Sequence, residues 1–289
     1  MYKIAHISDM HISLRDENEH GRKLIKLLKS IEQQKCDHVI ITGDLVENAI
    51  KQDMLYVKEI LSHFNLLYPE KLSIVPGNHD IFGGAFNGEP GYYFPTHCKN
   101  TDYDNNLKTF SEIFCDSFPG KNNFPYLKLI DNIAVIAVNS IDRWSEDENM
   151  EGSNGRISEE DLHKIRVILK SERVRDKYKI ILLHHHLYKE EIREDLPVHS
   201  LWLKTISWKM KIRKRKMLLK FFKKYKVNLI LHGHTHVSEV YNRNGLSLVN
   251  SSACIMPLSE DLTKKYNIIS IPSEEETDKN IMVETISLK

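Results

Sequence analysis

The sequence lacks the long apolar runs and the paired cysteines that mark membrane proteins and disulfide-rich proteins. Its longest apolar stretch, residues 133–138, has the length of one strand, whereas a membrane span needs roughly 18–20 residues. The four cysteines are scattered without a CxxC pair, which favours reduced single thiols over a disulfide framework. The N-terminus reads MYKIAHISD and lacks the basic and apolar regions of a secretory signal, so we expect a cytoplasmic protein.

An excess of charge of one sign is also lacking. The 289 residues include 41 Lys and Arg against 40 Asp and Glu, which gives a net charge of +1. This balance argues against a globally basic nucleic-acid binder and against an acidic tail protein. The hydrophobic share of 41% and the charged share of 28% are typical of a folded globular chain. Histidine, by contrast, is frequent, with 15 residues that are unevenly distributed.

Short apolar runs typical of β-strands alternate with amphipathic helical repeats at 24–31, 57–64, 162–169 and 218–225. The early order of strand, helix, strand, helix, strand predicts parallel strands with right-handed crossovers. The late run of strands predicts a second, more antiparallel sheet. The expected strands are 2–8, 38–42, 72–75, 126–129, 133–139, 179–183, 228–231, 238–241, 247–250, 266–271 and 281–286.

The domain organisation follows from the spread of these segments. Strand-like segments extend to both ends of the chain, and no linker rich in Gly, Ser or Pro divides them. We therefore expect a single domain over residues 1–289, with insertions at about 82–106 and 187–210.

Polar side chains of three types follow five of the predicted strands. In an open α/β sheet, ligands bind beyond the carboxyl ends of the strands, so residues distant in sequence are expected to converge there. The residues at these strand ends are Asp9 and His11; Asp44; Asn78, His79 and Asp80; His184, His185 and His186; and His232, His234 and His236.

The chemistry of this set indicates metal binding. Carboxylate, amide oxygen and neutral imidazole suit divalent Mn, Fe, Co or Zn. On an extended strand end, Asp9 and His11 point the same way because they are two residues apart. Each motif alone also has an ordinary structural explanation, but their joint occurrence after predicted strands makes coincidence a poor account. A set of seven ligands drawn from these side chains would be too many for one tetrahedral ion. Such a set suits two ions that share a carboxylate.

In order and spacing, the motifs resemble those of the calcineurin-like metallophosphoesterases, over residues 4–250. The resemblance implies an α/β fold of four layers, an α/β/β/α sandwich of two mixed sheets flanked by helices. The pair Asn139–Ser140 and the turn Gly155–Ser158 are similar to the class III cyclic-nucleotide phosphodiesterase branch. Glu47 begins the stretch where the phosphoprotein phosphatase branch has Asp-Arg-Gly, so we do not expect protein phosphatase activity. The shared motifs are Asp9–His11, Gly43–Asp44, Gly77–Asp80, residues 184–186 and Gly233–His236.

The same resemblance implies two divalent metal ions, Mn, Fe or Zn, with Asp44 as the bridging ligand. His184 is chosen from its run because it directly follows a predicted strand. His185 stays an alternative, because Leu187 follows the run where the family usually has a proline. The implied ligands are Asp9, His11, Asp44 and His236 for one ion, and Asp44, Asn78, His184 and His234 for the other.

The expected activity is hydrolysis of phosphodiester or phosphomonoester bonds in a small substrate, by attack of a hydroxide that bridges the ions. We expect His79 to donate a proton to the leaving oxygen. By the resemblance, Glu47 orients His79, and we expect Asp80 to fix a neighbouring histidine. A scaffold with a degenerate site is disfavoured, because every ligand position and His79 are present.

One segment keeps a second enzymatic hypothesis open. Residues 204–226 contain eleven Lys or Arg and no acid. They could bind a nucleic acid or an anionic lipid, which would make the chain a nuclease or a phospholipid-precursor hydrolase. An apolar stripe through Leu218, Phe222 and Tyr225 favours the simpler interpretation, a solvated helix that packs on the sheet.

Overall fold

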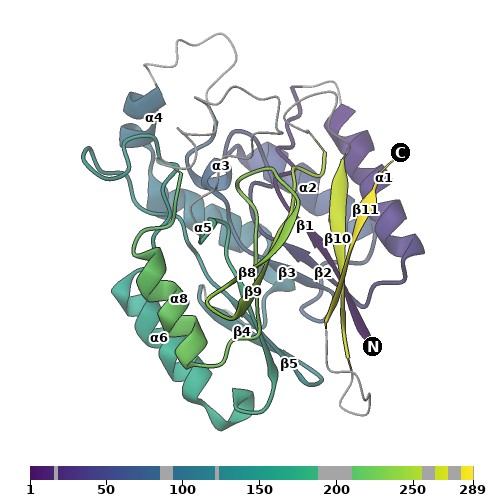
Figure 1. Cartoon of the computed structure of the whole chain (residues 1–289). Coiled ribbons are helices and arrows are strands. Elements are labelled where there is room, and N and C mark those ends of the chain that lie inside the picture. The colour runs from purple at the N-terminus through teal and green to yellow at the C-terminus, as the bar shows by residue number, and fades with distance from the viewer. Residues whose placement is uncertain are drawn as a thin grey trace, which may run out of the picture.

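Two β-sheets with helices on their outer faces form the architecture of the protein in a computed structural model (Figure 1). Both sheets mix parallel and antiparallel pairs, so the prediction of a mixed α/β fold with two mixed sheets flanked by helices is confirmed. The structure describes residues 1–15, 19–84, 94–120, 124–187, 210–255, 264–272 and 281–288.

The first sheet has the strand order β11-β10-β1-β2-β3. Its centre is formed by the parallel strands β1 (Tyr2–Ile7), β2 (His38–Ile41) and β3 (Leu72–Ile74). The strands β10 (Lys265–Ile271) and β11 (Met282–Ser287) add to β1 in antiparallel pairing. The end of the chain therefore completes the sheet in which the chain begins.

The second sheet has the strand order β4-β5-β6-β7-β9-β8. Its four central strands β5, β6, β7 and β9 run parallel, and the edge strands β4 and β8 run antiparallel to their neighbours. The bounds are β4 Tyr126–Ile130, β5 Ile133–Ala137, β6 Tyr178–Leu182, β7 Leu229–His232, β8 Glu239–Arg243 and β9 Leu246–Asn250.

The helices lie on opposite sides of the molecule, with α1 on one side and α6 and α8 on the other (Figure 1). The continuous apolar run at residues 133–137 forms strand β5, and both faces of this strand are buried. Its Ile133 and Val135 face the core shared with the first sheet, and Ile136 joins the core beneath α6 and α8. The helices are α1 Glu19–Gln33, α2 Lys51–His63, α3 Asn78–Ile81, α4 Phe94–Asn100, α5 Tyr103–Ile113, α6 Glu159–Lys170 and α8 Arg215–Lys224, with 3-10 turns η2 Cys115–Ser117 and η3 Glu172–Val174.

The eleven expected strands are all observed, with ends that agree within two residues. The expected second, more antiparallel sheet of late strands is confirmed only in part: β8 pairs antiparallel with β9, and β10 with β11, but these strands belong to different sheets. Strand β9 pairs in parallel with β7, and β10 pairs with β1, whose edge would otherwise leave its backbone groups unbonded. Residues 85–93 of the first expected insertion and residues 188–209 of the second lie outside the described residues. The single domain stays a prediction.

Candidate metal centre

The carboxyl ends of β1, β2, β6 and β7, together with the start of α3, meet at one edge of the two sheets and carry the predicted ligands. Each of the seven lies within 3.5 Å of another member of the set. All have low exposure except His236, whose side chain is 21% exposed. The seven are Asp9, His11, Asp44, Asn78, His184, His234 and His236.

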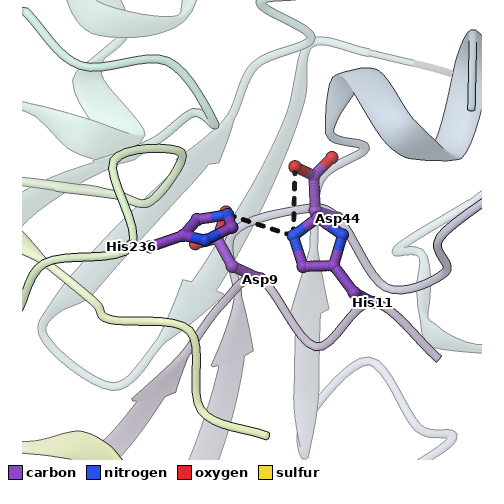
Figure 2. Close-up of side chains that lie close together, drawn as sticks. All are labelled: Asp9, His11, Asp44 and His236. Atoms are coloured by element: carbon purple, nitrogen blue, oxygen red, sulfur yellow. Dashed lines mark hydrogen bonds and ion pairs between the residues drawn. The ribbon is translucent and has the colours of Figure 1, made fainter. Parts of the chain in front are cut away.

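The first half-site, as we call the group Asp9, His11, Asp44 and His236, gathers one possible ligand atom from each residue within 4.8 Å of the others (Figure 2). His11 Nε2 lies 3.1 Å from His236 Nε2 and 3.8 Å from Asp44 Oδ2. His236 Nε2 also lies 3.5 Å from Asp9 Oδ1. Two imidazoles and two carboxylates thus face one small volume.

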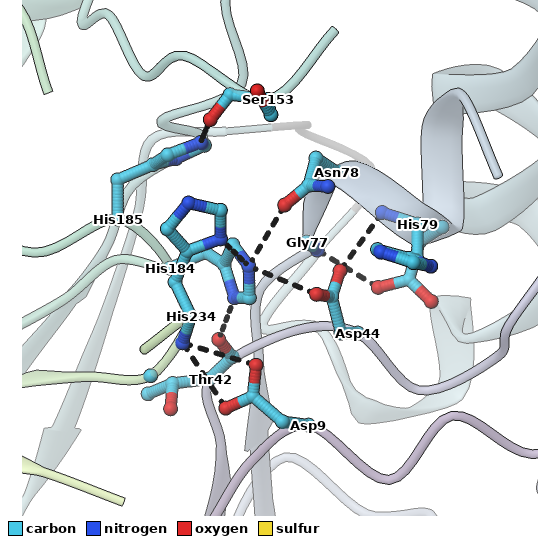
Figure 3. Close-up of polar contacts among 12 residues, drawn as sticks. Asp9, Thr42, Asp44, Gly77, Asn78, His79, Ser153, His184, His185 and His234 are labelled. Carbon is cyan, nitrogen blue, oxygen red and sulfur yellow. Dashed lines mark hydrogen bonds and ion pairs between the residues drawn. The ribbon is translucent and has the colours of Figure 1, made fainter. Parts of the chain in front are cut away.

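The second half-site consists of Asp44, Asn78, His184 and His234 (Figure 3). His184 Nε2 lies at its centre, 3.2 Å from Asp44 Oδ2, 3.2 Å from Asn78 Oδ1 and 3.0 Å from His234 Nδ1. Asp44 Oδ2 is the oxygen that also faces His11 in the first half-site. Asp44 therefore stands between the two groups.

The tautomers of two histidines test whether this donor set fits a cation. His184 Nδ1 donates to the carbonyl oxygen of Thr42 at 2.7 Å, so a neutral ring presents the lone pair of Nε2 to the oxygens of Asp44 and Asn78. His11 Nδ1 lies 2.7 Å from Glu47 Oε2 and leaves Nε2 as an acceptor in the same way. Lone pairs that converge without a hydrogen between them fit a divalent metal ion, and nitrogen with oxygen ligands suits Mn, Fe or Zn.

Five of the seven predicted ligands have an unusual backbone conformation. The φ angles of Asp9, His11, Asp44, His234 and His236 are 52°, 48°, 50°, 76° and 59°. Non-glycine residues in the left-handed region cost about 1–3 kcal/mol each and persist where surrounding bonds hold them. Here the His234 N–H donates to both carboxylate oxygens of Asp9 at 3.0 and 3.1 Å, and the His11 N–H donates to the carbonyl of Asp44 at 3.0 Å. Such strain gathers at functional sites.

Charges within the site stabilise one another. Burial lowers the pKa of His184, but the neighbouring carboxylates of Asp44 and Asp9 raise it more, to about 9. The pKa of His11 is also about 9, because Glu47 and Asp44 outweigh the effect of burial. Burial raises the pKa of Asp44, yet the charges of His184 and His79 hold it well below its ordinary value. A divalent ion would replace these protons as the balancing positive charge, so binding should release protons.

The structure brings His184, and not His185, against Asp44. Both ring nitrogens of His185 are engaged elsewhere, with Nδ1 2.9 Å from Ser140 Oγ and Nε2 3.2 Å from the carbonyl oxygen of Ser153. Figure 3 shows the ring of His185 directed toward Ser153 and away from Asp44. The contacts therefore favour His184 as the ligand.

His79 and Glu47 lie beside the first half-site, but their pairing differs from the expected one. The His79 N–H donates to Asp44 Oδ1 at 2.8 Å, and His79 Nδ1 lies 3.0 Å from the carbonyl oxygen of Glu47. The Glu47 carboxylate lies 2.7 Å from His11 Nδ1 and 3.6 Å from His79 Nδ1. The carboxylate of Glu47 thus bonds to His11 and lies farther from His79, whose Nδ1 bonds to the backbone carbonyl of Glu47. That the carboxylate orients His79 stays a prediction.

Asp80 also has partners other than the expected histidine. Its Oδ1 accepts from the N–H groups of Leu45 and Val46 at 2.9 and 3.1 Å, and its Oδ2 accepts from the Gly77 N–H at 2.8 Å. The reason is that Asp80 lies within α3 with its carboxylate under the loop that carries Asp44. A Cβ on Gly77 would lie 2.1 Å from Asp44 Oδ1, so this close approach requires glycine. Asp80 therefore joins the loops that carry Asp44 and Asn78.

Comparison with known proteins gives the same assignment as this geometry. The family model of calcineurin-like phosphoesterases matches residues 2–238. The chain belongs to the calcineurin-like phosphoesterase family. It is therefore a hydrolase that acts on phosphoesters, in a family that uses divalent metals, and its His and Asp clusters could hold them.

Two curated relatives of this calcineurin-like phosphoesterase carry phosphodiesterase names. A "Probable cyclic nucleotide phosphodiesterase" of Ruthia magnifica is 24% identical over 271 residues, which covers 92% of each chain. A 3',5'-cyclic adenosine monophosphate phosphodiesterase of Haemophilus influenzae is 22% identical over 268 residues, with 90% of this chain and 78% of the relative covered.

Solved structures show the same fold. A dimetal phosphatase from Danio rerio matches with a TM-score of 0.59 at 12% identity, covering 99% of this chain and 98% of the other. The protein TT1561 of Thermus thermophilus matches with a TM-score of 0.55 at 15% identity, covering 100% and 99%.

Two residues that support the site in this phosphoesterase had no role in the motif set. The backbone carbonyl of Thr42 fixes His184, as described above, but any residue carries a carbonyl, so no sequence signal exists for it. Ser140 Oγ accepts from the N–H groups of His184 and His185 at 3.1 and 3.2 Å. The Asn139–Ser140 pair after a predicted strand was a signal for Ser140, although not for this role.

The described part of the basic segment contains a packed helix, preceded by two basic residues that form ion pairs. On α8, Leu218, Leu219 and Phe222 are buried against the second sheet. Arg213 pairs with Glu148, and Lys214 Nζ lies 2.7 Å from Glu159 Oε1. Residues 204–209 lie outside the described residues, so binding of nucleic acid or lipid stays a prediction. In the part of the chain that the structure describes, none of the helices has the length and apolar character to cross a membrane.

Proposed function

We propose that this calcineurin-like phosphoesterase is a phosphodiesterase with two divalent metal ions, Mn, Fe or Zn, that hydrolyses small phosphodiesters such as cyclic nucleotides. Small phosphomonoesters are its second substrate class. The observation that carries the proposal is the position of Asp44, whose Oδ2 faces the acceptor nitrogens of both His184 and His11. The names of the two curated relatives support a cyclic-nucleotide substrate.

The two half-sites divide the binding of the ions. One ion would be held by Asp9, His11, Asp44 and His236, and the other by Asp44, Asn78, His184 and His234. When bound, such a pair of ions polarises the phosphoryl oxygens and lowers the pKa of water toward neutrality. The contribution of the chain is to fix these ligands before substrate binds, through the bonds that commit the other nitrogens of His11 and His184.

His79 is the residue that we assign to the leaving group. Its Nδ1 is held by the carbonyl oxygen of Glu47, which leaves Nε2 for the oxygen that departs from phosphorus. Its side chain is 22% exposed, so substrate can reach it. A positioned proton donor of this kind contributes about 10²–10⁴-fold to a rate.

The test combines a substrate panel with a variant that keeps the ligands. Purified protein with added Mn²⁺ is assayed on cyclic AMP, bis-p-nitrophenyl phosphate and p-nitrophenyl phosphate, with and without a chelator. We expect turnover of the diesters that the chelator abolishes. His79→Gln should lower turnover by about 10²–10⁴-fold while two ions remain bound.

Two results would overturn the proposal. Wild-type protein that binds no ions, or that turns over none of these esters with Mn, Fe or Zn, would return the chain to the scaffold hypothesis. Unchanged turnover in His79→Gln would remove His79 from the mechanism but leave the metal site in place.

A further inference from the structure

The carboxylate of Glu47 lies between two histidines of the site and is unequally shared. Its Oε2 is 2.7 Å from His11 Nδ1, within hydrogen-bond distance, and 3.6 Å from His79 Nδ1, which is beyond it. His79 Nδ1 instead bonds to the backbone carbonyl of the same residue at 3.0 Å. Removal of the Glu47 side chain would therefore leave the bond to His79 intact and remove the bond to His11.

We propose that Glu47 is a positioning residue that prepares the first half-site for its metal ion through His11; this inference rests on the proposed function. A carboxylate at Nδ1 holds the ring hydrogen on that nitrogen, so that the lone pair is on Nε2. His11 Nε2 is the atom that faces His236 and Asp44. The carboxylate also makes the imidazole a stronger electron donor toward a cation.

Close packing keeps the carboxylate in this position. The Glu47 N–H donates to the carbonyl of Ile12 at 3.0 Å, and its own carbonyl accepts from the Gly84 N–H at 2.7 Å. A Cβ on Gly84 would lie 2.4 Å from Glu47 Oε1, so the glycine backbone lies directly against the carboxylate. At His184 in the second half-site, the neutral backbone carbonyl of Thr42 occupies the place that this carboxylate has at His11. Glu47 should therefore act on one ion and leave the other unaffected.

The experiment measures the binding of two Mn²⁺ ions separately from catalysis. Wild type, Glu47→Ala, Glu47→Gln and His79→Ala are titrated with Mn²⁺ in competition with a chelator, and bound metal is counted by mass spectrometry. We expect Glu47→Ala to bind one ion like wild type and the other about 10–100-fold more weakly. Glu47→Gln should lie between, since its amide oxygen still accepts from His11. His79→Ala, the matched control, should bind both ions normally.

Turnover at increasing Mn²⁺ gives a second, independent measurement. If Glu47 acts through the metal, Glu47→Ala should recover most of its kcat at saturating Mn²⁺, and the loss should lie in the Mn²⁺ concentration that half-saturates the rate.

The outcomes separate this inference from the proposed function. Wild-type affinity for both ions in Glu47→Ala overturns the role of Glu47 while the two-metal site stands. Weakened binding of both ions also overturns it, since the inference assigns Glu47 to the first half-site alone. A low kcat that saturating Mn²⁺ does not restore, with normal binding, would assign the carboxylate to His79 instead. Wild-type protein without bound ions would overturn the proposed function itself.

Discussion

The two half-sites use the same residue types but differ in depth and in how their histidines are held. In the first, the side chain of His236 is 21% exposed, and that of the adjoining Glu47 is 35% exposed. In the second, the side chain of His184 is fully buried. His11 is held by the carboxylate of Glu47, whereas His184 is held by the backbone carbonyl of Thr42.

The difference follows from what a buried charge costs. At the rim, the carboxylate of Glu47 keeps contact with water, so it can stay charged and polarise His11. A second carboxylate behind His184 would have to be desolvated beside Asp44, which is unfavourable. The neutral carbonyl of Thr42 orients the ring without that penalty. We therefore expect the second half-site, which is deep, to be rigid. We expect the first half-site, which is more open, to change its metal binding when residues around it change.

The largest effect on metal binding and turnover should come from Asp44, the residue that the two half-sites share. Asp44→Asn removes the shared negative charge at nearly constant volume, so both ions should bind more weakly. Turnover should fall by more than the about 10–100-fold typical of a residue that only supports a ligand. Metal content and kcat measure this. Asp104→Asn, which changes an exposed acid paired with Arg143, is the matched control, and loss of a single ion would show that Asp44 serves one half-site.

The motifs predicted this site in large part because each lies at a strand end. The residues Asp9, Asp44 and His184 each follow a buried apolar strand, and parallel strands place their carboxyl ends at one edge. The relative positions of side chains on one strand end depend only on local geometry. The convergence of the seven predicted ligands could therefore be predicted from residue types and strand order.

The partners of the supporting residues could not be predicted in the same way. Glu47 and Asp80 are near several acceptable partners, and distances of a fraction of an ångström decide which bond forms. The alternatives 2.7 Å and 3.6 Å for Glu47 differ by less than one bond length. The pairing of β10 with β1 joins residues at opposite ends of the sequence, which local patterns do not encode.

In metal-free protein, a substitution in the second half-site should lower the free energy of unfolding more than one in the first. His184→Ala leaves the buried carbonyl of Thr42 and the carboxylate of Asp44 without their partner, which costs about 1–3 kcal/mol of unfolding free energy. His236→Ala removes a partly exposed ring, so its cost should be smaller. Urea unfolding of both variants in chelator, with circular dichroism as the readout, measures the difference. Equal losses would contradict the distinction between a deep and an open half-site.

The smallest effect is the pH dependence of the metal-free protein. The folded pKa values of His11 and His184 are about 9, above the ordinary 6.5. A raised folded pKa gives a contribution that is complete below pH 6.5 and lost as pH rises through 9. The melting temperature in chelator should therefore fall between pH 6.5 and 9.

Core histidines provide the contrast and the control for this pH dependence. Burial lowers the pKa of His6 and His38 to about 3, so their contribution is lost only as pH falls below 6.5. These two core histidines should thus contribute nothing to a loss of stability between pH 6.5 and 9, in contrast to His11 and His184. His184→Gln and His11→Gln should each flatten part of the alkaline slope, and saturating Mn²⁺ should reverse it, because metal binding strengthens as those protons leave. An alkaline slope that both variants keep would mean that the charge balance of the half-sites does not depend on these two rings.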